Sequence, residues 1–328
     1  MLKQKKSFTQ LGLLAVIAAI LPLIMLAFGY SYGVLLCCLI EIYIIAVSGL
    51  DVCFGYSGQI SIGHVAFYAI GAYTSGIVTN NLSLPPILSM ILGAILAALV
   101  GMLLAYPASK LVFHFLALAT IAFGEIIYQL IAHSPGEITG NLRGMTSTYV
   151  SLFGFELDTN LRFYFFGLVC MLLFLLAKVF LVDSKVGRAF IAVRENTHAA
   201  EGMGINVRKY KVLAFAISAF FTGFAGAMYM HLVRYISPDT FVQKQSIMFI
   251  TMLLFGGTAS LLGPIIGVVT ITVLTEVLRS FQDYQMLIYG ILMLAVIVAL
   301  PGGIYGAVRD LAAKLRAKRT GGKSHAES

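Results

Sequence analysis

Charged residues are scarce in this chain. Of its 328 residues, only 11% are charged, whereas 59% are hydrophobic. Soluble domains carry about 25% charged and about 45–50% apolar residues, because they need charge to cover their surface. The 14 acidic and 22 basic residues cannot cover a globule of this length. The composition excludes a soluble enzyme and a disordered chain, and it indicates an all-α polytopic membrane protein.

Cysteine is scarce as well, with four residues in the chain. Cys37, Cys38, Cys53 and Cys170 lie in or beside apolar runs, and their spacing does not match that of metal ligands. We expect them to be small residues that face the core or the lipid, and a secreted disulfide scaffold is excluded.

Catalytic motifs are missing too. The chain contains neither HExxH nor GxSxG, and no paired carboxylates share a helix face at a suitable depth. GGKS, at Gly321 to Ser324, resembles the end of a P-loop, but Ala317 stands where that motif requires its first glycine. The sequence predicts a chain that is not an enzyme, needs no cofactor or metal, and cannot hydrolyse ATP by that route on its own.

Apolar runs of the length of a membrane span are plentiful. A transmembrane helix needs about 20 mostly apolar residues. Seven runs are clear: Leu11 to Phe28, Tyr32 to Leu50, Pro86 to Tyr106, Leu111 to Ala132, Phe163 to Val182, Val212 to Val233 and Tyr284 to Leu300. Ile60 to Val78 is less regular, and Ser246 to Leu278 is too long for one helix. Dividing the latter at its glycines predicts about ten transmembrane segments, two of them short or Gly-interrupted.

Basic residues gather at the two ends and in one loop, and they are not interleaved with aromatic residues as in a nucleic-acid interface. If the N-terminus is cytoplasmic, ten segments place 17 basic residues inside, Lys110 and Lys178 among them, and 5 outside, as the positive-inside rule requires. Nine segments would leave the basic tail outside. We therefore expect a cytoplasmic N-terminus (1–10), whose following apolar run is an uncleaved first helix, one membrane domain (11–305) and a cytoplasmic tail (306–328).

Two glycine-rich interruptions stand out, GYSGQISIG at Gly55 to Gly63 and FGGTASLLGP at Phe255 to Pro264. Irregular backbone at membrane depth is tolerated only where protein buries it or where it lines a cavity. Broken segments in both halves of a chain point to a translocation path. The glycines could equally serve close helix packing, and the two roles are compatible.

The longest inner loop, residues 183–210, has helical character. One apolar stripe is formed by Val186, Phe190 and Val193, and Asn196 is an expected N-cap for a second short helix that ends near Gly204. An amphipathic helix at this face lies on lipid or docks into a protein groove. The mixed charges favour a protein partner.

Ionisable residues within the predicted spans are few: Glu41, His64, His114, Glu125 and Glu276. Each either contacts the substrate or carries a proton, or makes a hydrogen bond between helices, and both roles stay open. Their scarcity counts against an ion-coupled secondary transporter.

Several strings resemble the permease subunits of branched-chain amino acid ABC importers, and more closely the LivM-type subunit. They are GYSGQISIGHVAFYAIGAY (55–73), SKVGRAFIAVREN (184–196), AAEGMGINVRKYK (199–211), SPDTF (237–241), GGTASLLGPIIG (256–267) and PGG (301–303). The resemblance covers about residues 50–306. TGNLRG (139–144) also resembles a segment of this family's outer loop.

The resemblance implies a multi-pass protein of the bacterial inner membrane that works by alternating access. Its implied partners are a second homologous permease (LivH-type), two cytoplasmic ABC ATPase subunits, an extracytoplasmic solute-binding protein and membrane lipid. Loop 183–210 becomes the element that couples to the ATPases. The residues expected to make that contact are Arg188, Arg194, Glu195, Glu201 and Gly204.

A branched-chain amino acid offers an apolar side chain and a zwitterion, which needs a few polar partners. The residues of the two interruptions that could supply them are Gly58, Gln59, Ser61, Gly63, His64, Thr258 and Ser260. Urea and short amides are alternative cargoes for a permease of this kind, and an ion-coupled carrier is an alternative from another class.

Overall fold

The computed structural model describes residues 2–27, 29, 31–110, 113–152, 155–279 and isolated positions between 284 and 309. The chain divides into two compact units, residues 1–250 and 251–328. Among the described residues, five helices are long and apolar enough to cross a membrane. A mostly helical chain is thereby confirmed, and its long apolar helices are consistent with a polytopic membrane protein. The count of about ten segments stays a prediction, because most of Tyr284 to Leu300 and of the tail lies outside the described residues.

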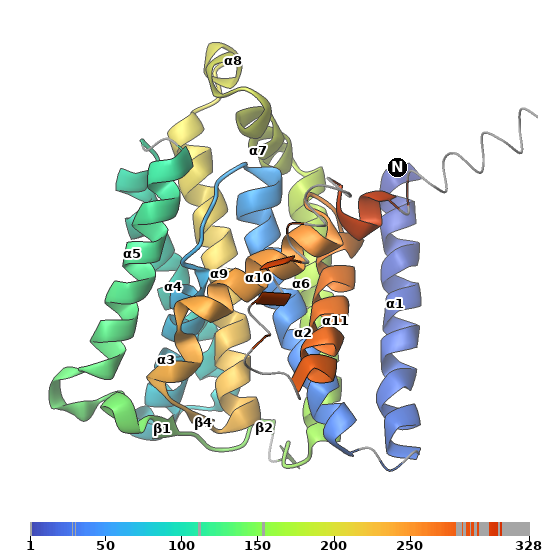
Figure 1. Cartoon of the computed structure of the whole chain (residues 1–328), viewed down its shortest axis with the longest axis vertical. Coiled ribbons are helices and arrows are strands. Elements are labelled where there is room, and N and C mark those ends of the chain that lie inside the picture. The colour runs from blue at the N-terminus through green and yellow to red at the C-terminus, as the bar shows by residue number, and fades with distance from the viewer. Residues whose placement is uncertain are drawn as a thin grey trace, which may run out of the picture. The chain divides into compact units, whose positions relative to one another are not determined.

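The elements follow the predicted runs closely, and they are labelled in Figure 1. The long helices of the first unit are α1 (Leu2–Ala27), α2 (Ser31–Asp51), α3 (His64–Leu82), α4 (Pro86–Ala108), α5 (Phe113–Ala132), α6 (Asn160–Asp183) and α9 (Val207–Val233). Two short helices, α7 (Lys185–Glu195) and α8 (Thr197–Gly202), join α6 to α9. Helix α10 (Gln243–Gly256) crosses the boundary between the units, and α11 (Leu262–Val277) lies in the second unit.

The core of the first unit is built around α9, which packs against α2, α3 and α4. Small residues make the approach close. A Cβ atom on Gly71 of α3 would overlap the carbonyl oxygen of Gly223 on α9, and one on Gly93 of α4 would press on the carbonyl oxygen of Gly71. Since apolar surface alone does not drive association in lipid, such close backbone packing holds membrane helices together.

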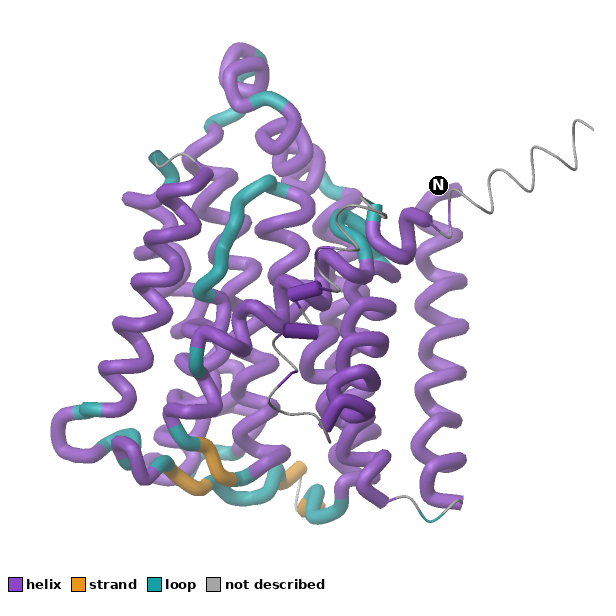
Figure 2. Tube along the Cα trace, in the orientation of Figure 1, coloured by secondary structure: helices purple, strands orange, loops and turns teal. Residues whose placement is uncertain are grey.

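The connection between α5 and α6 lies at the end of the unit opposite α7 and α8 (Figure 2). It contains the 3₁₀ turns Pro135–Glu137 and Asn141–Arg143, and the strands β1 (Met145–Thr146), β2 (Ser151–Leu152) and β3 (Phe155–Glu156). Strand β1 pairs antiparallel with β4 (Tyr235–Ile236), which follows α9, and β2 pairs with β3. A last 3₁₀ turn, Pro238–Phe241, leads into α10.

A buried histidine ties this connection to the helices. Nδ1 of His231 on α9 donates to the carbonyl oxygen of Thr148 at 3.2 Å, and Nε2 lies 2.9 Å from the hydroxyl of Ser75 on α3. The loop between α5 and α6 is therefore fixed to the core rather than only appended to it.

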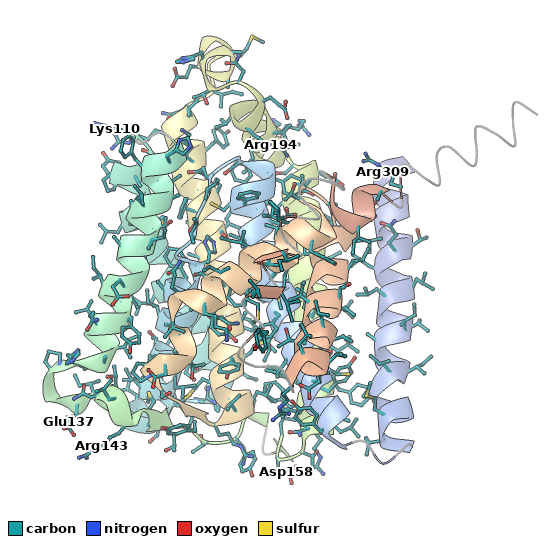
Figure 3. All side chains as sticks on the ribbon, in the orientation of Figure 1. Lys110, Glu137, Arg143, Asp158, Arg194 and Arg309 are labelled. Carbon is teal, nitrogen blue, oxygen red and sulfur yellow. The ribbon has the colours of Figure 1, made fainter. Side chains whose placement is uncertain are left out.

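Charged side chains lie at the two ends of the first unit. Figure 3 shows Lys110 and Arg194 at the end that carries α7 and α8, and Glu137, Arg143 and Asp158 at the other. The N-terminal end of α1 lies at the same end as α7 and α8 (Figure 1). The distribution of basic residues also predicts that the N-terminus and loop 183–210 lie on one side; that this side is cytoplasmic stays a prediction.

Candidate functional site

The first glycine-rich interruption begins later than its sequence predicts. Helix α2 continues to Asp51 and passes into a five-residue π-helix, η1 (Val52–Tyr56). Residues 57–63 are then non-helical, and α3 begins at His64. Single π-helical turns are rare and occur frequently at functional sites. We call residues 57–63, together with His64 at the start of α3, the first break.

The first break runs between the helices of the unit (Figure 2), and side chains from other elements bind its backbone. The amide N–H of Ile62 donates to Oγ1 of Thr120 on α5 at 3.0 Å, and its carbonyl oxygen accepts from Nε2 of Gln243 at 2.7 Å. A Cβ atom on Gly63 would overlap the carbonyl oxygen of Thr120, so only glycine fits there. Buried irregular backbone is tolerated because these partners satisfy it.

The polar side chains of the first break are engaged within the chain. His64 is buried, and its ring nitrogens Nδ1 and Nε2 each lie 2.6 Å from a serine hydroxyl, that of Ser61 and that of Ser218 on α9. Nε2 of Gln59 donates to the hydroxyl of Ser57 at 2.7 Å and to the carbonyl oxygen of Lys211 at 3.1 Å. In this conformation Ser61 and His64 contact each other, Gln59 binds groups that were not predicted to line the path, and Gly58 is exposed.

A small cavity adjoins the first break. It measures about 50 Å³ and is lined by Val65, Gly124, Glu125, Tyr128, Phe241, Val242 and Gln243. Pockets for small-molecule ligands typically measure about 300–1,000 Å³, so this cavity is too small for an amino acid as it stands. Glu125 faces out of α5 and accepts a hydrogen bond from Gln129 at 2.8 Å.

The second interruption is shorter than predicted. Helix α10 ends at Gly256, residues 257–261 are non-helical, and α11 begins at Leu262. We call residues 257–261 the second break. Ser260 closes it locally, because its hydroxyl donates to the carbonyl oxygen of Gly257 at 3.2 Å and accepts from the N–H of Gly263 at 2.9 Å. Thr258 is half-buried.

Close packing surrounds the second break within the second unit. Cβ atoms on Gly263 and Gly267 would overlap the carbonyl oxygens of Gly257 and Met252, and Gly303 lies against the backbone of Gly257. The packing role that the sequence left open is therefore visible in these glycines.

Loop 183–210 forms two capped helices, as its sequence predicts. Oγ of Ser184 accepts from the N–H groups of Val186 and Gly187 at the start of α7, and Oδ1 of Asn196 accepts from Ala199 N at the start of α8. Both side chains satisfy amides that a helix start leaves unpaired. The predicted apolar stripe faces inward, with Phe190 and Val193 buried.

The candidate coupling residues divide into two groups. All five are exposed, and they differ in their contacts: Arg188, Arg194, Glu195, Glu201 and Gly204. Arg188 donates to the carbonyl oxygen of Asp183, in the same corner of the chain, at 3.1 Å. Arg194 differs, because its Nη1 donates to the carbonyl oxygen of Gly55 in the π-helix at 2.5 Å. The structure thus joins one predicted coupling residue to the element that precedes the first break.

A buried ion pair escaped the sequence analysis. Nζ of Lys178 on α6 lies 2.8 Å from Oδ2 of Asp51, and the two side chains are 1% and 0% exposed. The sequence analysis counts Lys178 among the inner basic residues that orient the chain. Its side of the membrane stays a prediction, but a buried cation neutralised by Asp51 presents no net charge to the membrane surface, so Lys178 does not help to orient the chain. A lysine inside an apolar run is the signal that could have found it.

The remaining ionisable residues are dispersed. Glu41 is buried on α2 against Gly167 of α6, His114 lies exposed near the start of α5, and Glu276 pairs with Arg279 at the end of α11 at 3.3 Å. All four cysteines are free and buried. Within the described residues, no group of three or more His, Cys, Asp or Glu side chains is placed to hold a metal ion.

Comparison with known proteins identifies the family. The family described as "Branched-chain amino acid transport system / permease component" matches residues 33–297. The high-affinity branched-chain amino acid transport system permease proteins LivM of Escherichia coli (strain K12) and Salmonella typhimurium (strain LT2) are each 32% identical over 293 residues, 82% of this chain and 68% of the relative.

A more distant relative belongs to the other permease type. The probable branched-chain amino acid transport permease protein LivH of Methanocaldococcus jannaschii is 27% identical over 263 residues, 74% of this chain and 81% of the relative. No solved structure matches the chain. The match along residues 33–297, together with the identity to the two LivM proteins, shows that this chain belongs to the family of permease components of branched-chain amino acid transport systems.

Proposed function

We propose that this chain is the transmembrane permease subunit of an ATP-driven ABC importer of branched-chain amino acids, and that it works by alternating access. The observation that carries the proposal is the 32% identity to LivM over 82% of the chain. The described residues support a translocation role, because a membrane-spanning helical unit holds a buried, non-helical segment at its centre.

Helices α7 and α8 are the proposed docking element for separate ATPase subunits. They project from one end of the first unit (Figure 1), and their exposed face carries charges of both signs, which suit a protein groove better than an anionic lipid surface. Arg188, Glu195 and Glu201 make the proposed contacts, and Gly204, with φ of +80°, turns the chain after α8. ATP-driven closure of the ATPase pair would then move this element.

The first break is the proposed moving wall of the translocation path. Its groups Gln59, Ser61 and His64 are paired inside the chain in the described conformation. Alternating access requires two states with different contacts. In the other state these groups exchange their internal partners for the zwitterion of the substrate. Gly58 and Gly63 have no side chain, so the backbone there leaves room for neighbouring groups. Thr258 and Ser260 of the second break are a separate proposal of the same kind.

The proposed assembly contains a second, homologous permease, two cytoplasmic ATPases and an extracytoplasmic binding protein, in the bacterial inner membrane. Both termini are proposed to lie in the cytoplasm. The likeness to both LivM and LivH proteins supports a pair of related permeases.

The test is uptake by proteoliposomes that contain this chain with its partner permease, ATPases and binding protein. We expect labelled leucine to enter only with ATP inside the compartment that holds the ATPases, and only when the binding protein is present. Uptake of urea or acetamide in place of leucine would overturn the substrate class. Uptake driven by an ion gradient without ATPases would overturn the mechanism.

A further inference from the structure

Helices α6 and α7 form one bent element rather than two helices on a flexible linker. Ser184 is both the C-cap of α6 and the N-cap of α7. A Cβ atom on Gly187 would overlap the carbonyl oxygen of Val182, so the first turn of α7 packs directly on the last turn of α6. Arg188 donates across the corner to Asp183. A force on α7 therefore turns this corner as a whole.

Both arms of the corner hold the π-helix η1. On the α6 arm, Lys178 binds Asp51, which is the N-cap residue of η1, and its Nζ lies 5.8 Å from the ring centroid of Tyr56. On the α7 arm, Arg194 donates to the carbonyl oxygen of Gly55. The contact between Lys178 and Asp51 is a buried ion pair, and breaking it would leave a buried charge without a counter-ion. We therefore take this contact as the one that stays intact when α7 moves. The contact between Arg194 and Gly55 is a hydrogen bond at the edge of the unit.

Arg194 also lies next to the point at which the π-helix gives way to non-helical chain. Gly58 has φ of +71°, and a Cβ atom there would come within 3.0 Å of Cγ of Arg194. From this point the first break leads to His64. No residue between Gly58 and His64 belongs to a helix, so no helical hydrogen bonds within the segment hold it in place when this entry point is displaced.

We propose that Arg194 is a positioning residue that transmits movement of α7 to the first break, with the Lys178–Asp51 pair as the pivot. This assigns Arg194 to an internal contact of the permease, in place of the ATPase contact that its sequence position suggests. The guanidinium suits the role, because its several N–H donors can follow a moving carbonyl while its charge needs no buried acid. The inference rests on the proposed function.

The test uses the complete importer with Arg194→Gln, Arg194→Lys and, as a matched control, Lys185→Gln. Lys185 lies exposed on the same helix, and its replacement removes the same charge. Three quantities are measured: ATPase subunits that co-purify, ATP hydrolysed, and leucine taken up per ATP.

We expect Arg194→Gln to retain its ATPases but to lose at least about tenfold in leucine uptake per ATP, since a charge-assisted hydrogen bond is lost. Arg194→Lys, which keeps one cationic donor, should recover part of the ratio, and Lys185→Gln should match the unaltered importer. If Arg194→Gln does not accumulate, Arg194→Lys carries the same test with a smaller expected loss.

An unchanged ratio in the Arg194 variants would overturn the proposal. Loss of the ATPases from Arg194→Gln, with their retention in Lys185→Gln, would also overturn it, because Arg194 would then be an ATPase contact. Failure of the proposed function is distinguishable, since it would appear as absent ATP-driven uptake in the unaltered importer.

Discussion

The two breaks have similar sequences and different structures. Each follows a Phe-Gly pair, at Phe54 and at Phe255, and has a hydroxyl residue two positions after that glycine. The first break is bound by side chains from distant elements, among them Thr120 and Ser218. The second break is closed by its own Ser260. The difference teaches that similar glycine motifs can be held by side chains of distant elements in one place and closed by their own serine in another.

The comparison predicts that substitutions around the first break destabilise the protein more than substitutions in the second. The largest effect is expected for Lys178→Met, which leaves Asp51 buried without its counter-ion beside η1. Breaking a buried pair in this way costs about 3–5 kcal/mol. Thermal unfolding in detergent would measure it. The double variant Lys178→Met/Asp51→Asn should recover much of the loss, and a double variant no more stable than the single one would contradict the pair's role.

Gly63→Ala comes next. The added methyl group would overlap the backbone of Thr120, so α5 or the first break must shift, at a cost of about 3 kcal/mol. The matched control is Gly12→Ala on α1, where nothing lies within 4 Å of the added atom. The yield of folded protein and its unfolding temperature distinguish the two. Equal behaviour of both variants would show that the packing at Gly63 is loose.

His64→Ala is expected to have a moderate effect. It leaves the hydroxyls of Ser61 and Ser218 buried without their shared partner, which costs about 2 kcal/mol. If the first break also lines the path, leucine uptake per folded molecule should fall beyond what the stability loss explains. Normal uptake by the folded fraction would restrict His64 to a packing role.

Ser260→Ala is expected to have the smallest effect. It removes two local hydrogen bonds at a half-buried position, where water can replace part of them, at a cost of about 1 kcal/mol. The same unfolding assay measures it. A loss greater than that of His64→Ala would reverse the comparison between the two breaks.

Sequence reasoning succeeded where the signal is local. The apolar runs place the helices, the pattern of loop 183–210 predicts two short helices, and Asn196 caps the second of them. These features depend on hydrophobic length, period and capping, which neighbouring residues decide. The family resemblance was confirmed by the match along residues 33–297.

Sequence reasoning failed where residues that are far apart in the sequence are in contact. Asp51 and Lys178 are 127 positions apart, and Arg194 and Gly55 are 139 apart, so no periodicity reveals either contact. The π-helix was missed for another reason. Its hydrogen bonds join residues i and i+5 instead of i and i+4, and this difference has no characteristic amino-acid composition. Lys178 was misread since a lysine near the end of an apolar run looks like a flanking charge.

The central claim is that α7 and the first break move together, whereas the second break does not depend on that contact. Hydrogen–deuterium exchange on the complete importer, with and without ATP and vanadate, tests it most directly. We predict that trapping changes exchange in α7 and in residues 57–63, and that Arg194→Gln keeps the change in α7 but abolishes it in residues 57–63. A change in α7 with unaltered exchange in residues 57–63 of the unsubstituted importer would contradict the account.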